Sequence, residues 1–464
     1  MKNTKFFSNP VYPEVLKLSL PIALQNIFST AVTSADVIMV GQISQDALSA
    51  VSLAGQIQFV LNLIFLGLTL GTGLMTAQYW GKKDTHTIEN ILGFALKIAA
   101  AISLVFTIGA CFFAPQLMHL FTRETVLISY GSNYLRIVGI SYLFMGISQI
   151  YQAVIKTIGN VKKSSLISST ALILNIIFNA VLIFGWFGLP KLGVVGAALG
   201  TLFSRGIECG WCLFDSLNGK DDITSVKIRW SGIMTKNKLL IQDFWNYTLP
   251  ITLNGLSWGS AFATYSIILG HLGSDVVAAN SIATVARNFA MVGCNGLASG
   301  AGIYLGALLG KNELKKAGED GNRIMSLTVC LGILGGVLIL LASPILLHLV
   351  KLTSTAENYL RTMLFINAAY VLTKALNTML NNGIFCAGGD TKFGLICDTI
   401  DMWCFSVPLG FVCAFLLKLP PMTVYFILCL DELAKLPFAY HHFKTDKWVK
   451  NITRETEEMH YDNG

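Results

Sequence analysis

Charged residues are scarce in this chain. Of its 464 residues only 13% are Asp, Glu, Lys or Arg, while 53% are hydrophobic and the mean hydropathy is +0.61. A water-soluble domain cannot bury that much apolar surface. Twelve apolar runs are long enough to cross a bilayer, and backbone groups in hydrocarbon must close their hydrogen bonds within such a run. We therefore predict an all-α integral membrane protein with twelve transmembrane helices. The predicted spans lie near residues 15–40, 51–77, 91–113, 131–155, 165–187, 193–214, 241–270, 279–305, 324–347, 359–384, 393–417 and 421–441.

Motifs for nucleotide binding and enzyme chemistry are also missing. The sequence has no GxxxxGK[ST] phosphate loop, which excludes ATP as a direct source of energy. The nearest match to the Asp-rich magnesium motif of membrane prenyl transferases, Asp221-Asp222, falls in a polar connection. The ten cysteines are scattered, and the single CxxC, Cys209 and Cys212, lies inside an apolar span without a second pair, which favours packing over redox or zinc chemistry. We predict neither an enzyme nor a bound cofactor.

Basic residues are unevenly distributed, and their distribution is more informative than the net charge of +7. Alternate loops and both tails hold 22 Lys and Arg residues, whereas the remaining loops hold four. By the positive-inside rule both termini are cytoplasmic, which requires an even number of spans and agrees with twelve. The basic charge therefore indicates membrane topology, with the lipid bilayer as partner and no nucleic acid.

The sequence repeats itself at an offset of 229 residues. LSLPIAL at 18–24 falls on YTLPITL at 247–253, and glycines and a loop lysine match for about a hundred residues, after which we place a four-residue slip. Each half holds an even number of spans, so we predict two six-helix lobes related by a pseudo-two-fold axis along the membrane normal. The predicted parts are an amino-terminal lobe (1–214), a cytoplasmic linker (215–240), a carboxy-terminal lobe (241–443) and a cytoplasmic tail (444–464).

One carboxylate, Asp36, interrupts the first span, although an acid in hydrocarbon costs about 2.5–3.5 kcal/mol on insertion scales. Asn175 and Asn179 share one face of the fifth span, and the sixth adds Thr201 and the carbonyl of Ala197 at the same spacing. These groups supply hard oxygen ligands for Na⁺, and the carboxylate alone can take H⁺. Two alternatives stay open: the acid could snorkel to the nearby helix end, and Asn and Thr commonly hold membrane helices together.

The second half has no copy of this acid, because Asp36 falls on Tyr265. On the sixth span Arg205 and Glu208 form an expected internal pair. The second half has its own acids, which serve either transport or structural ion pairs: Asp398, Asp401, Asp431 and Glu432. Small polar, aromatic and methionine side chains predict a substrate cavity between the lobes, although each also suits ordinary packing. The candidates are Asn254, Trp258, Tyr265, Asn288, Met291, Asn295, Tyr370 and Asn377.

Three stretches resemble the multidrug and toxic-compound extrusion (MATE) family: LPIALQNIFSTAVTSADVIMVGQIS, ANSIATVARNFAMVGCNGLASGAGIYLGALLG and CAGGDTKFGL. The likeness covers the chain from Val15 to about Thr453. It implies a secondary antiporter of twelve helices that exchanges Na⁺ or H⁺ for organic, often cationic, compounds while its two lobes alternate between facing inward and outward.

The resemblance also implies which residues couple the ion. Carried over position by position, the amino-lobe cation or proton site of the family falls on Asp36, Asn175, Asn179, Ala197 and Thr201. Some members have an Asp where this chain has Asn179. The carboxy-lobe acids of another branch fall here on Trp258 and Leu376, so we place the coupling on Asp36.

The resulting hypothesis is an exchange of ions at Asp36. The ionised carboxylate favours uptake of substrate, Na⁺ or H⁺ from outside favours release, and Pro21 is the hinge that lets the first helix bend. Expected substrates are small organic compounds, cationic or lipophilic, as in multidrug efflux. A flippase for a lipid-linked or amphipathic substrate is the alternative. It predicts a strongly basic cavity, whereas Arg136, Arg205 and Arg287 are scattered and show no convergence on one. The likeness further suggests a multi-pass monomer in a bacterial plasma membrane.

Overall fold

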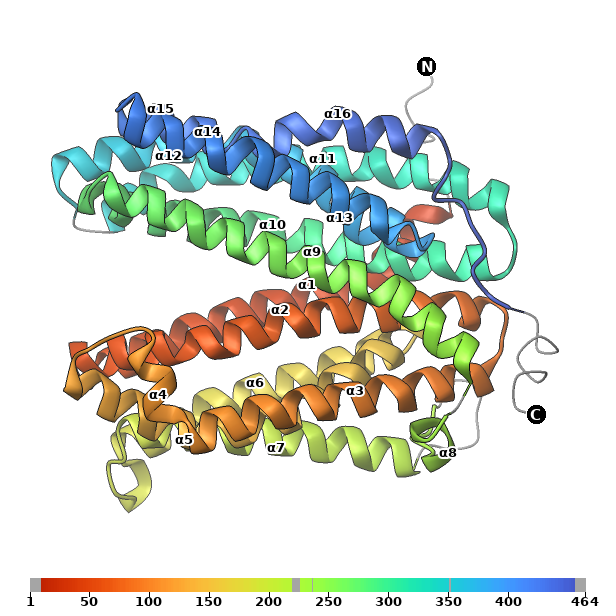
Figure 1. Ribbon diagram of the computed structural model, residues 1–464, viewed down its shortest axis with the longest axis horizontal. Coiled ribbons are helices and arrows are strands. Elements are labelled where there is room, and N and C mark those ends of the chain that lie inside the picture. The colour runs from red at the N-terminus through yellow and green to blue at the C-terminus, as the bar shows by residue number, and fades with distance from the viewer. Residues whose placement is uncertain (1–9, 219–225, 236, 350–351, 455–464) are drawn as a thin grey trace. The chain divides into compact units, whose positions relative to one another are not determined.

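The computed structural model describes residues 10–218, 226–235, 237–349 and 352–454 (Figure 1). Regular structure in these ranges is helical throughout, and each of the twelve predicted spans falls on helix, as predicted. Asp221, Asp222 and the tail beyond Arg454 lie outside the described residues. The helices of the first half are α1 (Val11–Gly41), α2 (Gln45–Gly81), α3 (Thr85–Phe112), α4 (Ala114–His119), α5 (Thr125–Thr157), α6 (Val161–Phe184), η1 (Trp186–Gly188), α7 (Val194–Asn218) and α8 (Trp230–Ile233). Those of the second half are α9 (Lys238–His271), α10 (Ser274–Gly310), α11 (Leu314–Leu349), α12 (Ser354–Thr378), η2 (Met379–Phe385), α13 (Thr391–Thr399), η3 (Ile400–Ser406), α14 (Val407–Phe411), η4 (Val412–Leu416), α15 (Pro421–Leu428) and α16 (Asp431–Lys444).

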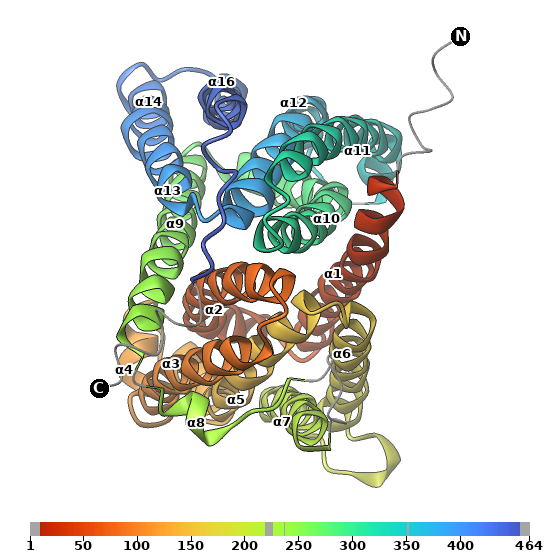
Figure 2. The same cartoon turned by 90° about the vertical axis from the view of Figure 1, so that its right-hand side faces the viewer.

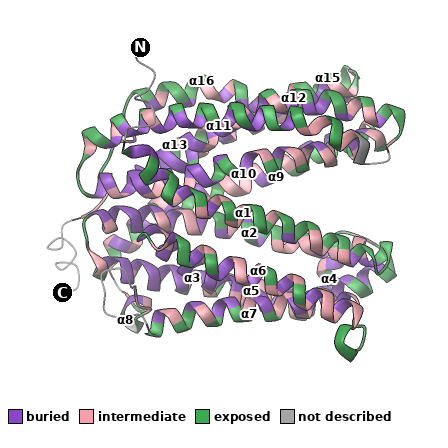
Figure 3. Cartoon of the chain, turned by 180° about the vertical axis from the view of Figure 1, so that it is seen from behind, coloured by how far each residue is buried: buried purple, intermediate pink, exposed green. Residues whose placement is uncertain are grey.

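The helices have the length and surface expected in a bilayer. Within the described ranges, nine are long and apolar enough to cross a membrane by length and composition. The other three predicted spans correspond to α7, to α9 and to the pair α15 and α16, which a turn at Cys429 and Leu430 separates. Large apolar side chains such as Val105 (68% exposed) and Phe365 (73% exposed) stand outward, and buried and exposed positions alternate along the long helices (Figure 3).

Helix boundaries reproduce the internal repeat. Helices α2 and α10 each have 37 residues, and both their starts and their ends differ by 229. The same offset relates the starts of α3 and α11 and of α5 and α12. Lys83 and Asn312, also 229 apart, both have the uncommon positive φ of a tight turn (63° and 64°).

One correction concerns where the repeat slips. The left-handed glycines before α6 and α13, Gly159 and Gly389, lie 230 residues apart, so one residue has been gained and the predicted four-residue slip is wrong. The extra residue coincides with η2, where the backbone is wound as a π-helix. A π-bulge is the usual way for a helix to accommodate one inserted residue, and such bulges are frequent at functional sites.

The chain divides into two compact units, which we describe separately. The amino-terminal unit comprises Leu24–Trp245 together with Arg454–Gly464, and the carboxy-terminal unit comprises Met1–Ala23 together with Asn246–Thr453. Both internal boundaries fall inside helices, α1 and α9, so each of these helices passes from one unit into the other. The lobe limits given by the sequence stay a prediction.

Each unit packs around one central helix (Figures 1 and 2). In the amino-terminal unit α5 contacts α2, α3, α6 and α7. In the carboxy-terminal unit α12 contacts α10, α11 and α16, and η3 contacts α16. Polar side chains on these central helices and their neighbours therefore face other helices and need partners there.

Candidate functional site

Asp36 lies in the amino-terminal unit and meets the amides of α6, as the sequence predicts. The Asn179 Nδ2 donates to Asp36 Oδ1 at 2.8 Å, and it also reaches Asn175 Oδ1 at 3.3 Å. Both asparagines are buried, whereas Asp36 is half-buried. The acid therefore does not snorkel away from the helix bundle; it is held by an amide 143 residues further along the chain.

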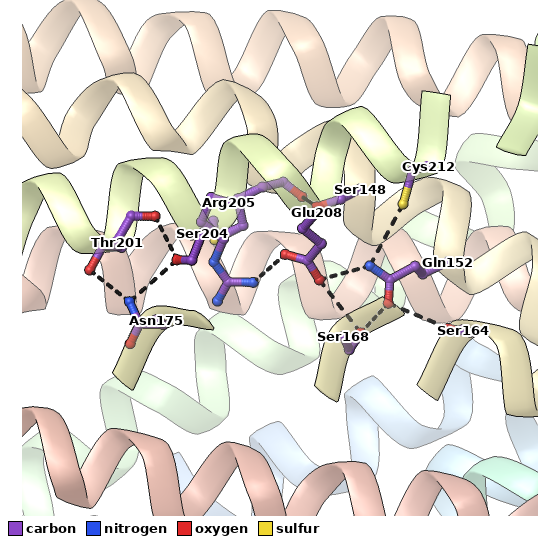
Figure 4. Close-up of polar contacts among 11 residues, drawn as sticks. Ser148, Gln152, Ser164, Ser168, Asn175, Thr201, Ser204, Arg205, Glu208 and Cys212 are labelled. Carbon is purple, nitrogen blue, oxygen red and sulfur yellow. Dashed lines mark hydrogen bonds and ion pairs between the residues drawn. The ribbon is translucent and has the colours of Figure 1, made fainter. Parts of the chain in front are cut away.

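The oxygen and nitrogen of the Asn175 amide can be assigned in two ways, and the two assignments give different partners. In one, its nitrogen donates to Thr201 Oγ1 at 3.4 Å and to Ser204 Oγ at 3.3 Å (Figure 4), while its oxygen faces the Asp36 carboxylate, which is also an acceptor. Turned over, its nitrogen donates to both Asp36 oxygens at 3.1 and 3.2 Å, and this assignment gives both atoms of the amide a suitable partner. Oxygen and nitrogen of an amide occupy nearly the same space, so the surroundings decide between the two.

Helix α7 contributes Thr201 and Ser204, which lie next to Asn175. Thr201 Oγ1 donates to the Ala197 carbonyl at 3.1 Å, and Ser204 Oγ donates to the Thr201 carbonyl at 2.9 Å. The structure thus brings together all five predicted residues and adds Ser204, which the sequence analysis missed. Its position, three residues after Thr201 and so on the same helix face, was the available signal.

A second residue missed from the sequence is Gly200. Asn179 approaches the α7 backbone so closely that a Cβ on Gly200 would collide with Asn179 Oδ1 and would lie 3.0 Å from its backbone nitrogen. The same Asn179 oxygen is buried and has no hydrogen-bond partner within the described part of the chain. The Asn179 amide therefore has its nitrogen on Asp36 and its oxygen against Gly200 of α7.

A polar chain continues from this site along α7 (Figure 4). The predicted pair of Arg205 and Glu208 is confirmed, with 2.7 Å between Nη1 and Oε2. Gln152 on α5 donates to the other Glu208 oxygen at 2.8 Å, and Ser168 on α6 bonds to the Gln152 oxygen. Three helices therefore meet at a junction in which the buried carboxylate of Glu208 is fully engaged.

Pro21 lies inside the continuous helix α1, which runs from Val11 to Gly41. It has no N–H to donate to the carbonyl one turn earlier, and this weakens the helix at that point. Its repeat counterpart, Pro250, likewise lies inside α9. The hinge role of Pro21 stays a prediction.

Two of the four secondary acids form a buried ion cluster in the carboxy-terminal unit. Lys435 Nζ lies 3.1 Å from Asp398 Oδ1 and 3.0 Å from Glu432 Oε2. Asn381 and Asn254 donate to Asp398, at 3.1 Å and 2.9 Å. Asn254, a candidate for the substrate cavity, therefore serves an ion cluster.

The other two acids are Asp401 and Asp431, both buried, and Asp431 Oδ1 accepts from the backbone N–H of Glu432 at 2.7 Å. No salt bridge to Asp401 or Asp431 is found among the residues that the structure describes.

Asn377, another cavity candidate, donates to Glu432 Oε2 at 2.8 Å and to its backbone carbonyl at 2.6 Å.

Aromatic cavity candidates gather around a lysine. The rings of Trp258, Phe262 and Tyr370 lie 4.9–5.5 Å from Lys374 Nζ, close enough for cation–π attraction. Arg287, which is buried, lies 5.5 Å from the Tyr370 ring.

The remaining cavity candidates differ in exposure. Met291 and Tyr265 are buried in an apolar core, whereas Asn288 and Asn295 are exposed. Leu376, where another branch of the family has an acid, packs against a second apolar core. The cavity between lobes stays a prediction.

Twelve helical spans in two homologous halves, with a carboxylate and two amides inside the first half, define a polytopic membrane transporter. The MatE family model matches residues 21–181 and again 250–412, so its two copies begin one repeat offset apart. The chain therefore belongs to the MatE family, whose members are membrane transporters.

Known relatives and solved structures agree. The chain is 21% identical to an uncharacterized transporter, YisQ, of Bacillus subtilis, covering 94% of this chain and 95% of the relative. It is 23% identical to the multidrug export protein MepA of Staphylococcus aureus (82% and 80% covered). A MATE crystal structure in the straight conformation superposes with a TM-score of 0.85 at 17% identity (96% and 99% covered). A MOP superfamily transporter from Pyrococcus furiosus, described as having a binding pocket of reverse polarity, superposes with a TM-score of 0.84 at 18% identity (96% and 98% covered).

Proposed function

We propose that this protein is a secondary antiporter that exports organic compounds, cationic or lipophilic, in exchange for Na⁺ or H⁺. Relatives named as multidrug export or multidrug resistance proteins support the efflux part. The single observation that supports the exchange part is the contact of Asp36 with Asn179 at 2.8 Å, which keeps an ionisable oxygen inside the helix bundle.

The Asn175 amide is the group that we propose responds to occupancy of the site. A bare Asp36 carboxylate favours the orientation in which Asn175 donates to it. A carboxyl group neutralised by Na⁺ or H⁺ favours the other, because the Asn175 oxygen then faces a positive centre and its nitrogen is free to donate to Thr201 and Ser204 on α7. Filling the site thereby changes the contact between α6 and α7, and bending at Pro21 is the proposed larger response.

The test is transport in everted membrane vesicles. We expect Asp36→Asn to lower gradient-driven uptake of a fluorescent organic cation by about tenfold or more, in the range of coupling free energies between linked sites. Running the assay with a Na⁺ gradient and, separately, with a pH gradient identifies the ion. Asp46→Asn, at an exposed acid in the first turn of α2, is the matched control and should transport normally.

The outcome that rejects this role is full transport by well-folded Asp36→Asn protein. The flippase alternative calls for a basic cavity, but Arg205 is paired with Glu208, so that residue gives it no support. Residence in a bacterial plasma membrane with both termini in the cytoplasm, and action as a monomer, are parts of the same proposal.

A further inference from the structure

The chain passes from one compact unit to the other at three places. Two of these crossings lie inside the helices α1 and α9, and the third falls after α16, between Thr453 and Arg454. Residues 449–454, which we call the tail segment, have no regular secondary structure (Figure 1). The end of a chain is held in place only where contacts tie it down, so the contacts of this segment explain its position.

The tail segment starts at an apolar anchor in the carboxy-terminal unit. Trp448, directly before it, is fully buried, and its ring stacks on that of Phe443 with 6.0 Å between the ring centroids. The backbone also packs tightly here, because a Cβ on Gly388 would collide with the Trp448 carbonyl. Trp448 therefore fixes where the tail segment begins.

The tail segment ends at a polar anchor in the amino-terminal unit. The Arg454 guanidinium donates two hydrogen bonds to the buried Asp243 carboxylate, from Nε at 2.6 Å and from Nη2 at 2.9 Å. The Arg454 backbone takes part as well, because its N–H donates to the Tyr79 hydroxyl at 3.3 Å and its carbonyl accepts from Lys82 Nζ at 2.7 Å. A two-pronged pair of arginine and carboxylate is strong and directional, so this anchor fixes the orientation of the side chain.

Helix α9 has a weak point where it crosses between the units. The crossing follows Trp245, so Asn246 is the first residue of α9 in the carboxy-terminal unit. Pro250 lies four residues further along. Because proline has no N–H, the Asn246 carbonyl lacks the hydrogen bond that an α-helix normally supplies at this position. The backbone of α9 therefore bends most easily at its own crossing.

The tail segment contacts α9 on both sides of this weak point. Arg454 binds Asp243, which lies just before the crossing. Ile452 Cγ2 and Tyr247 Cε1 each lie 3.0 Å from the position that a Cβ on Gly389 would occupy, so these two side chains are neighbours just after the crossing. The lengths also match, because one helical turn from Asp243 to Tyr247 rises about 6 Å and two extended residues reach about 7 Å.

We propose that Arg454 is a positioning residue: its pairing with Asp243 opposes bending of α9 at the crossing, and the pair opens when α9 bends during transport. A bend between Asp243 and Tyr247 changes the distance between the two contacts of the tail segment, so both contacts cannot persist through it. The role in transport rests on the antiport proposed above, whereas the effect on α9 does not.

Hydrogen–deuterium exchange of the purified protein in detergent measures the effect on α9. We expect Arg454→Gln and Asp243→Asn each to speed exchange of the amides between Asp243 and Leu249 by roughly tenfold, because loss of a charge-assisted pair makes local opening easier. Exchanging the two charges, Arg454→Asp with Asp243→Arg, should restore part of the protection. Lys447→Gln, at an exposed basic residue just before Trp448, is the matched control and should leave exchange unchanged.

Three results would overturn the proposal. The first is unchanged exchange in α9 in both single variants, and the second is a charge-exchanged protein that exchanges as fast as they do. Should the Asp243 variants fail to stay monodisperse, Arg454→Lys decides, because it keeps the charge and loses the two-pronged geometry. Exchange as slow as in the unmodified protein would then be the third.

Uptake of an organic cation into everted vesicles tests the part that concerns transport. We expect Arg454→Gln to raise the rate at saturating substrate above that of Lys447→Gln, because a pair that must open adds to the barrier of that step. An equal or lower rate would show that opening of the pair is not part of the cycle. If the unmodified protein transported none of the compounds tested, the antiport proposal would fail, while the exchange measurement would still decide the effect on α9.

Discussion

The same three-helix junction occurs in both halves with its charges reversed. In the amino-terminal unit Gln152, Ser168 and Glu208 meet, and Arg205 pairs with Glu208. When equivalent helices are aligned by their first residues, the repeat counterparts of Gln152, Ser168, Glu208 and Arg205 are Asn381, Asp398, Lys435 and Glu432, in that order. These also meet, with an acid now preceding a base on the last helix. The repeat has therefore preserved where polar side chains converge and not which sign they carry.

Because the charges are reversed, the two junctions differ in net charge. Glu208 is matched by one arginine, whose side chain is 27% exposed, and by neutral donors. Lys435, whose side chain is 5% exposed, lies between two carboxylates, so its junction is negative by one charge. The amino-terminal junction can thus serve as structural support for the Asp36 site, whereas the carboxy-terminal junction leaves charge for neighbouring groups to compensate.

The largest effect is expected from Lys435→Met. It leaves Asp398 and Glu432 buried without their cation, and breaking a buried pair in this way costs about 3–5 kcal/mol. We expect unfolding of the purified protein in detergent at a clearly lower temperature, read by size-exclusion chromatography after heating. Adding Asp398→Asn should recover part of the loss, because it removes one of the stranded charges.

Lys447→Met provides the control, since that lysine is exposed in the same unit and its loss should change stability by less than about 0.5 kcal/mol. If Lys435→Met and Lys447→Met melted alike, the ion cluster would be energetically unimportant and the contrast between the halves would lose its basis.

A smaller effect is expected from Gly200→Ala, which acts only on the amino-terminal half. The added methyl collides with Asn179 Oδ1, and overpacking of this kind costs about 1–3 kcal/mol. Because Asn179 holds Asp36, we expect weaker coupling as well as lower stability. Gly210→Ala on the same helix is a matched control, because a Cβ there meets no atom within 4 Å. Transport by Gly200→Ala equal to that of Gly210→Ala would contradict the close approach as a requirement of the site.

Sequence patterns predicted the helices and the Asp36 group for definite physical reasons. Long apolar runs have only one way to satisfy their backbone in a bilayer, and residues four apart must share a helix face, so the amides of Asn175 and Asn179 could be placed together. The contact of Gly200 with Asn179 depends on how closely two helices pack, which the spacing of residues does not encode.

The π-helical turns were likewise not predicted from the sequence. Asp398 and Asp401 are three residues apart, a spacing that places two residues on one face of an α-helix, but the winding changes between α13 and η3. Asp398 lies 3.1 Å from Lys435 Nζ, whereas no salt bridge to Asp401 is found in the part of the chain that the structure describes. The choice between α and π winding depends on differences of hydrogen bonding and packing too small to read from residue types.

The smallest effect is expected from Arg205→Met, the counterpart of a change at Glu432. Glu208 would lose its cation but keep the amide of Gln152 at 2.8 Å, and the arginine is partly exposed, so the cost lies between that of a surface pair and that of a buried one, about 1–2 kcal/mol. The same heating assay should rank Arg205→Met well above Lys435→Met in stability. A reversed order would mean that the neutral donors around Glu208 contribute little and that Lys435 contributes less than Arg205 does, which would contradict the difference between the two junctions.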